Sequence, residues 1–317
     1  MKAASPHPTN PFHSSPLRNP AGIHARRGVS VVEIIVVVLI VLILLALSIP
    51  FVRNMRELTR RSNCDQNLMR LGLAMQAYAS DQLHLPTGTA SFNATIQLWP
   101  DIPSPETPAA DSPEQPAPIA SEPEGYHHNW VSSLLPYVDQ VGLFQSIDYS
   151  ASVYAESNRL IRETMVPVYR CSSDDPSPTN SSYAGLHHSL ASPITASNDG
   201  LLFLNAWVRP EEVPDGISAT ILLGEKHSYP GDLGWVSGTR ATLRNAGTPI
   251  NSLPNEEQLG DPSFVGGLGS RHFGGANVLK GDAAVTFLSE TIDLPLFQSM
   301  VNRNNLAEVK PAEADAN

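Results

Sequence analysis

The sequence predicts an α+β protein in which a long N-terminal helix, first membrane-spanning and then amphipathic, packs on a globular head with an antiparallel β-sheet. Three observations predict this class. An apolar run occupies Val29–Ile49, and apolar residues recur at helical spacing over Phe51–Asp81. After Val166 the pattern changes to short β-type runs separated by Pro, Gly, Asn and Asp.

The apolar run contains 21 residues. A helix of this length measures roughly 31 Å at about 1.5 Å per residue, enough to cross the hydrocarbon core of a bilayer. Isoleucine, leucine and valine occupy every side of it, which favours a span over a helix lying on the membrane surface. We therefore expect residues 29–50 to form a transmembrane helix.

The charges indicate an orientation. Residues 1–28 contain four cations and no acid, so the positive-inside rule predicts a cytoplasmic N-terminus. The prediction is a single-pass protein of the cytoplasmic (inner) membrane with a periplasmic or otherwise extracytoplasmic head. Arginines at 53, 56, 60 and 61 weaken this argument.

The net charge argues against a protein that binds nucleic acid. Residues 29–317 contain 16 cations and 31 acids, so removal of residues 1–28 changes the net charge from -11 to -15.

One carboxylate, Glu33, interrupts the apolar run. An acid within a membrane segment costs about 3 kcal/mol unless it is neutralised or paired. A free amine at Val29 would lie one helical turn away if the chain were cut after Gly28. The position of Glu33 therefore predicts such a partner.

The segment Gly28–Glu33, with Arg26 and Arg27 before it and an apolar helix after it, resembles the cleavage and methylation signal of type IV prepilins and type II secretion pseudopilins. The resemblance implies that a prepilin peptidase cuts after Gly28 and methylates Val29, where Phe or Met is usual. It also implies that Glu33 helps subunits to assemble. The alternative is a signal anchor, or a secretory signal peptide cut near Ala46–Ser48.

The remaining chain divides by composition. Residues 1–28 form a leader, and residues 51–100 form the amphipathic helix and the start of the head. Residues 101–125 hold seven prolines, six acids and no cation, which predicts a disordered insertion. Residues 126–306 form the α+β head, and residues 307–317 form a polar tail.

Within the head, we expect helices over His127–Ile147 and Ser152–Met165. The segment Arg240–Gly269 has no clear period and is predicted to be loop. Gly281-Asp282 is a two-residue turn signal between two β-type runs and predicts a hairpin. The candidate strands are Pro167–Cys171, Gly200–Val208, Ala219–Gly224, Gly234–Val236, Ala276–Lys280 and Ala284–Leu288.

The chain has two cysteines, Cys64 and Cys171. Both follow the apolar run, so the predicted orientation places them in an oxidising compartment. A bridge between them would stabilise the fold by roughly 4.7 kcal/mol in the chain-entropy model for a loop of about 100 residues. We favour the bridge, and two buried free thiols are the alternative.

Several phrases, in this order, resemble a family of large pilin-like proteins known by the domain of unknown function DUF1559. They are Cys64–Leu68, Leu71–Ala74, Trp130–Tyr137, Val168–Cys171, Ser182–Gly185, Asp215–Ile221, Gly224–Glu225, Arg271–Asn277 and Gly281–Asp282. The resemblance implies a membrane-anchored, pilin-like ectodomain and no named activity. The family's C-terminal motif corresponds here to His272, Gly274, Gly275, Asn277 and Asp282. Ala283 follows Asp282, where the family has Gly.

Metal and enzyme sites are less favoured. Glu225, His227, His272 and Asp282 are residue types that bind Zn²⁺, and Asp174-Asp175 is an alternative for Ca²⁺. Roles in turns and strand ends explain them better, so we predict no metal or cofactor. The sequence has no Gly-x-Ser-x-Gly elbow, phosphate-binding loop or His-Glu-x-x-His motif, so we predict no enzyme.

The favoured hypothesis is a membrane-anchored pilin- or pseudopilin-like structural subunit, processed after Gly28, that assembles through its N-terminal helix into a pilus- or secretion-type fibre. Its expected partners are prepilin peptidase, other pilin-like subunits (copies of itself or minor pseudopilins) and the inner membrane, with no nucleic acid. The alternative is a monomeric anchored module that binds a glycan, an ion or an envelope protein. An anchored hydrolase is a third, less favoured hypothesis.

Overall fold

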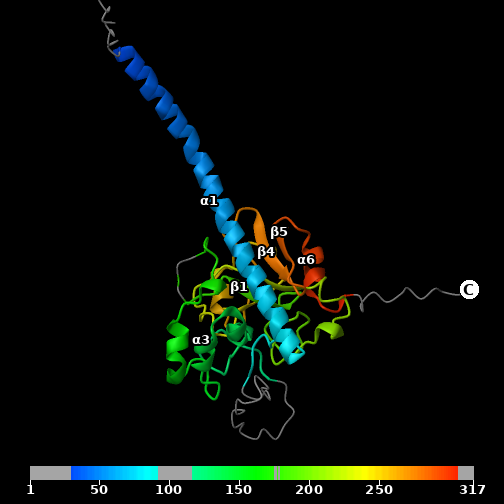
Figure 1. Ribbon diagram of the computed structural model, residues 1–317. Helices are drawn as coiled ribbons and strands as arrows, with labels where there is room; N and C mark the ends of the chain where they lie inside the picture. Colours follow the sequence, from blue (N-terminus) through cyan, green and yellow to red (C-terminus); the bar gives the residue numbers. More distant parts are fainter. Residues whose placement is uncertain (1–29, 92–115, 175–176, 178, 306–317) are drawn as a thin grey trace, which may run out of the picture. The chain divides into compact units, whose positions relative to one another are not determined.

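The computed structural model describes residues 30–91, 116–174, 177 and 179–305, with the main chain alone at residues 47–54 and 56. The chain forms two compact units, Met1–Val52 and Arg53–Asn317. Helix α1 (Val31–Gln82) begins in the first and ends in the second (Figure 1). The predicted leader and cleavage point, residues 101–115 of the insertion and the tail lie outside the described residues.

Side chains cap the start of helix α1. The Ser30 hydroxyl accepts a hydrogen bond from the Val32 amide at 3.3 Å, and the Glu33 carboxylate accepts one from the Ser30 amide at 3.0 Å. These contacts satisfy amide groups that have no partner within the helix. Glu33 therefore has a local structural role at the start of α1.

The membrane-spanning part of the predicted fold class is wrong for the described chain. Among the residues that the structure describes, no helix is long and apolar enough to cross a membrane. Glu33 lies in the first turn of α1, and the uninterrupted apolar run after it ends at Leu47. This run is shorter than the roughly 20 apolar residues that a crossing helix needs.

The head contains a five-stranded sheet in the order β3-β1-β2-β4-β5. Its strands are β1 (Tyr183–His188), β2 (Ile221–Glu225), β3 (Leu243–Asn245), β4 (Gly275–Lys280) and β5 (Val285–Ser289). The prediction of an antiparallel sheet is wrong, because β3 pairs with β1 in parallel while the other neighbours are antiparallel. The three residues of β3 lie in a segment predicted to be loop and are too few to show a period.

Burial follows strand position. The central strand β2 is buried at every residue, whereas the edge strand β5 buries Leu288 alone. Leu279 of β4 contributes to a core shared with α1, and its neighbour Val278 belongs to a second core with Phe297 and Val301. Successive residues of a strand point to opposite faces. The second half of α1 therefore covers one face of the sheet, and α6 (Leu294–Val301) covers the other.

The second half of α1 buries one stripe. Leu68, Leu71, Met75 and Tyr78 are all at most 1% exposed, as their helical spacing predicts. Leu58, which lies in the same predicted amphipathic segment Phe51–Asp81, is 61% exposed. The buried stripe therefore begins further along the helix than the sequence pattern suggests.

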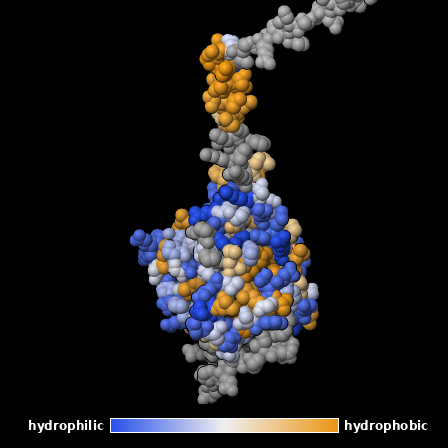
Figure 2. Space-filling model, turned by 60° about the vertical axis from the view of Figure 1, so that its left-hand side comes forward, coloured by the Kyte–Doolittle hydropathy of each residue, from blue (hydrophilic) through white to orange (hydrophobic). Residues whose placement is uncertain are grey.

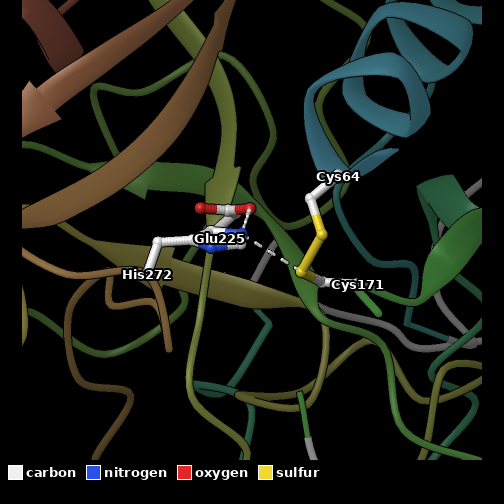
Figure 3. Close-up of side chains that lie close together, drawn as sticks. All are labelled: Cys64, Cys171, Glu225 and His272. Atoms are coloured by element: carbon white, nitrogen blue, oxygen red, sulfur yellow. Dashed lines mark hydrogen bonds and ion pairs between the residues drawn. A yellow bond between two sulfur atoms is a disulfide. The ribbon is translucent and has the colours of Figure 1, made fainter. Parts of the chain in front are cut away.

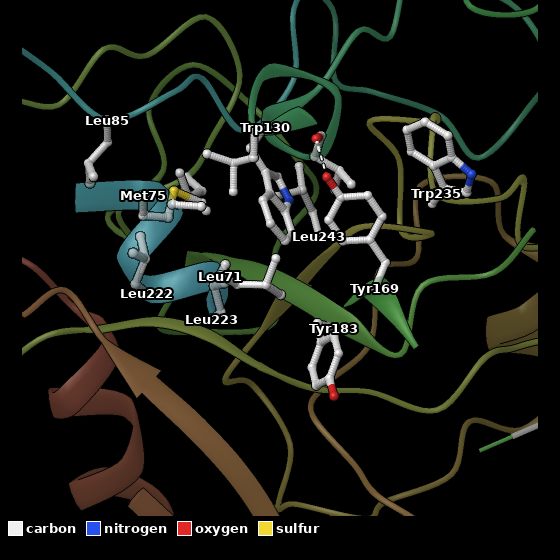
Figure 4. Packing of buried hydrophobic residues seen from close by; sticks show 14 of the residues in the cluster. Leu71, Met75, Leu85, Trp130, Tyr169, Tyr183, Leu222, Leu223, Trp235 and Leu243 are labelled. Carbon is white, nitrogen blue, oxygen red and sulfur yellow. Dashed lines mark hydrogen bonds between the residues drawn. The ribbon is translucent and has the colours of Figure 1, made fainter. Parts of the chain in front are cut away.

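Short helices and loops complete the head. Trp130 lies at the centre of the larger core and donates its indole hydrogen bond to the Thr242 carbonyl at 2.9 Å (Figure 4). The remaining α-helices of the described head are α2 (Trp130–Ser133), α3 (Val141–Gln145), α4 (Arg159–Glu163) and α5 (Glu256–Gly260). Short 3-10 turns are η1 (Leu135–Val138), η2 (Glu156–Asn158), η3 (Pro167–Tyr169) and η4 (Pro210–Glu212).

The described end of the predicted insertion, residues 116–125, packs on the head. Ile119 is 7% exposed and forms an isolated antiparallel bridge with Ile194. The Ser121 amide donates a hydrogen bond to the Pro262 carbonyl at 2.7 Å. One apolar side chain and main-chain pairing attach this proline-rich stretch to the head.

Candidate functional site

A disulfide ties helix α1 to the head. Cys64 of α1 and Cys171, which follows η3, are bonded across a sequence separation of 107 residues. Both are buried, at 0% and 6% exposure. The Tyr183 hydroxyl donates a hydrogen bond to the Cys64 carbonyl at 3.1 Å, so the α1 end of the bridge also contacts the sheet.

His272 lies beside this disulfide and next to Glu225 (Figure 3), with a second carboxylate, that of Glu57, on its other side. Its Nε2 is 3.4 Å from Cys171 Sγ and 3.5 Å from a Glu225 oxygen. Its Nδ1 is 2.7 Å from a carboxylate oxygen of Glu57, on α1. The candidate functional site is the cluster of Cys64, Cys171, Glu225 and His272, together with Glu57, which contacts Nδ1 of His272.

The strands position these groups. Glu225 is the last residue of β2, and its carboxylate accepts hydrogen bonds from the main-chain amide of Asn277 on β4 at 2.8 Å and from that residue's side chain at 3.3 Å. His272 precedes β4 in a turn where Gly274 has φ +85°, a conformation that favours glycine. The adjacency of β2 and β4 therefore brings Glu225 and His272 together.

The carboxylates control the charge of His272. Burial alone would lower its pKa, but the hydrogen bonds and negative charges of Glu225 and Glu57 outweigh burial and raise the pKa above its ordinary value. The His272 side chain is 1% exposed and that of Glu225 is 2% exposed. The imidazole thus lies between two carboxylates, of which that of Glu225 is buried and that of Glu57 is 42% exposed.

The structure separates the earlier metal candidates. Glu225 and His272 lie together, whereas His227 and Asp282 are not part of their cluster. In the described chain, the two residues that complete the cluster are Cys64 and Cys171. The Asp282 carboxylate accepts a hydrogen bond from the Ala284 amide in the β4–β5 turn at 3.0 Å, as its predicted turn role requires. Asp174 accepts one from the Ser182 hydroxyl at 2.6 Å, and Asp175 lies outside the described residues.

A second charged cluster holds the loops after β2. Asp232 contacts Lys226 at 3.1 Å, Arg240 at 3.3 Å and Arg244 at 3.4 Å, and all four side chains are at most 4% exposed. Burial tends to raise the pKa of Asp232, but the neighbouring Lys226 and Arg244 charges lower it. Carbonyl groups accept further hydrogen bonds from both arginines. This network stabilises the loops that follow β2, from Lys226 to Arg244.

Sequence reasoning missed Glu57 and the Asp232 cluster. Glu57 lies 215 residues from His272 in the sequence. Arg240 and Arg244 belong to a segment without period, which was predicted to be loop. Contacts of this kind depend on tertiary packing, and no local pattern indicates them.

The fold and site together define an α+β domain in which a disulfide joins an N-terminal helix to a mixed sheet. Residues 53–295 match the model of a family described as "Protein of unknown function (DUF1559)". The chain belongs to this family, as the ordered phrases from Cys64 to Asp282 predicted. No protein of curated function and no solved structure matches the chain.

Proposed function

We propose that this chain is a pilin-like structural subunit that associates with other copies, or with related subunits, through the N-terminal part of α1. One observation carries the proposal. Every large apolar side chain from Val31 to Leu45 is exposed, between 47% and 71%. Figure 2 shows this segment as a continuous hydrophobic surface on the viewed side.

An apolar surface of this extent supports association, because soluble monomers rarely expose large contiguous apolar patches. The proposed occupant is the same helix of a second subunit. Two such helices would cover one another's valine, leucine and isoleucine side chains. The prepilin-like signal supports this choice, since the resemblance implies assembly through the helix that follows the cleavage point.

Glu33 would serve assembly in addition to its local role. Its carboxylate accepts a hydrogen bond from the amide of Ser30, which leaves accepting capacity on its oxygens. In the proposal, prepilin peptidase cuts after Gly28, and the Val29 amine of a neighbouring subunit pairs with Glu33. Surrounding apolar side chains would strengthen this ion pair by excluding water.

The head would lie in an extracytoplasmic compartment. The Cys64–Cys171 disulfide supports this part of the proposal, because disulfides persist in oxidising compartments. The charge of -15 for the chain without residues 1–28, from 16 cations and 31 acids, would keep the heads of neighbouring subunits soluble.

Two substitutions separate the charge of Glu33 from its capping role. Glu33→Gln removes the charge and keeps a side chain that suits a capping box, whereas Ser30→Ala removes the cap and keeps the charge. We expect Glu33→Gln to abolish subunit crosslinking in cells. Ser30→Ala should weaken the helix start by about 1 kcal/mol and leave crosslinking near the wild-type amount.

The measurement is cysteine crosslinking between copies that carry Leu39→Cys, with Leu253→Cys on the exposed head surface as the matched control. Crosslinks at residue 39 that depend on Glu33 support assembly through α1. If the residue-39 copies crosslink no more than the residue-253 copies, the chain acts as a monomer and the alternative of a binding module replaces this proposal.

A further inference from the structure

The cluster around His272 has the donor set of a metal site. One ligand atom from each of Cys64, Cys171, Glu225 and His272 lies within 4.8 Å of the other three, and all four residues are buried. Two sulfurs, one imidazole nitrogen and one carboxylate oxygen suit tetrahedral Zn²⁺. Figure 3 shows the imidazole of His272 directed at Cys171 and the Glu225 carboxylate next to the imidazole.

The surroundings of the cluster match those of metal ligands. A ligating histidine usually gives its second ring N–H to a carboxylate, which fixes the tautomer and the ring orientation. Glu57 provides this contact at Nδ1, 2.7 Å away, and leaves Nε2 directed at Cys171 and Glu225. The Asn277 amide orients the Glu225 carboxylate in the same way.

A cross-link alone does not explain these neighbours. Burial of an imidazole and a carboxylate costs free energy, and a disulfide needs neither group for its stability. Apolar side chains would pack against the sulfurs at lower cost. The contacts of His272 with Glu225 and Glu57 offset part of this cost, and one metal ion shared by His272, Glu225 and the two sulfurs would offset more of it.

We propose that the disulfide is the oxidised form of a Zn²⁺ site made by Cys64, Cys171, Glu225 and His272. An external dithiol supplies two electrons and two protons. The sulfur–sulfur bond breaks, two thiols form, and the dithiol becomes a disulfide. Zn²⁺ then binds both sulfurs and Nε2 of His272. The two thiol protons, and the proton that His272 carries on Nε2 when charged, go to solvent, and Nδ1 keeps its proton toward Glu57.

The geometry requires modest movement. Zn–sulfur bonds of about 2.3 Å and Zn–nitrogen or Zn–oxygen bonds of about 2.0–2.2 Å place tetrahedral ligand atoms roughly 3.3–3.8 Å apart. His272 Nε2 already lies 3.4 Å from Cys171 Sγ and 3.5 Å from the Glu225 oxygen. The sulfurs separate once their bond is broken, so Cys64 makes the largest adjustment.

The test uses the full chain, reduced under anaerobic conditions with a phosphine and titrated with Co²⁺ as a spectroscopic probe for Zn²⁺. The reduced chain should bind one Co²⁺ with thiolate-to-cobalt charge-transfer and tetrahedral ligand-field bands. Zn²⁺ should displace the Co²⁺, and the oxidised chain should show no such bands.

Variants identify the ligands. His272→Ala and Glu225→Gln should each weaken Co²⁺ binding at least tenfold, and Glu57→Gln, which alters an orienting contact, about 10–100-fold. His227→Gln, outside the cluster, is the matched control and should bind as the wild type does. A reduced folded chain without these bands, or Co²⁺ binding as tight as the wild type's in either His272→Ala or Glu225→Gln, overturns the proposal.

Reduction could also unfold the head. In that case Zn²⁺ must restore the near-ultraviolet circular dichroism of the native chain, because metal binding supplies folding free energy. Failure of Zn²⁺ to restore it overturns the proposal as well.

Discussion

At the scale of single residues, burial determines the chemistry of His187. This side chain lies in β1 at 0% exposure, with Nδ1 3.0 Å from the Asn198 side-chain oxygen. Its Nε2 is buried and has no hydrogen-bond partner. Burial lowers the pKa of His187 to about 3, so the folded head keeps this imidazole neutral.

This shift predicts acid sensitivity. In the unfolded chain His187 takes up a proton below a pKa of about 6.5, whereas the folded chain resists protonation down to a pKa of about 3. The unfolded state therefore binds more protons between these values, and stability falls as pH falls. The loss attributable to His187 approaches about 1.4 kcal/mol per pH unit.

Urea unfolding at pH 7, 6 and 5 measures this effect. As the pH falls, the unfolding free energy of His187→Gln should decline less steeply than that of the wild type. The two slopes should differ by up to about 1.4 kcal/mol per pH unit. His84→Gln, at a partly exposed position, is the matched histidine control. Parallel curves for the wild type and His187→Gln would show that this histidine does not titrate with unfolding.

At the scale of elements, helix α1 meets the β4–β5 turn at Gly72. A Cβ atom added to Gly72 would lie 2.8 Å from the Ala283 Cβ and 2.8 Å from a Leu279 methyl. Ala283 itself has φ +67°, a left-handed conformation that suits glycine. Ala283 therefore combines backbone strain with a close contact to α1.

A double-mutant cycle tests this contact. Alanine normally improves a helix by about 1 kcal/mol over glycine, but Gly72→Ala should destabilise the head by about 1–3 kcal/mol because it overpacks the turn. Ala283→Gly should stabilise the head by up to about 1 kcal/mol and reduce the penalty of Gly72→Ala. Urea midpoints of the four proteins give the coupling.

Gly142 of α3 is the matched control, because an added Cβ there meets nothing within 4 Å. Gly142→Ala should therefore be neutral or stabilising. Strict additivity of Gly72→Ala and Ala283→Gly would contradict the proposed contact.

The elements also show what sequence patterns can reveal. Long periodic segments were predictable, since the buried stripe of α1 and the hairpin around Gly281-Asp282 follow from spacing and turn residues. The strands β1 and β3 were missed. Tyr183–His188 contains Gly185 and a histidine pair in place of a β-type alternation, and β3 has three residues. Pairing across the sheet stabilises both strands.

At the scale of the whole molecule, the chain has an N-terminal unit with an exposed apolar helix and a disulfide-bonded head. The phrases that predicted DUF1559 membership lie in the head, and residues 53–295 match that family. Four residues of the candidate site were candidates from the sequence: Glu225 and His272 as residue types that bind metals, and Cys64 and Cys171 as the favoured disulfide, which the structure contains. Their meeting at one place, with Glu57 beside them, depends on how α1 lies on the sheet, which spacing cannot indicate.

The central claim is that a processed N-terminus lets the apolar helix of one subunit pair with that of another. Mass spectrometry of the chain isolated from its native cells tests this most directly. The account predicts a mature chain that begins at Val29 with a methylated amine. An intact leader, or a chain that begins near Ser48, would remove the counter-charge proposed for Glu33 and contradict the assembly account.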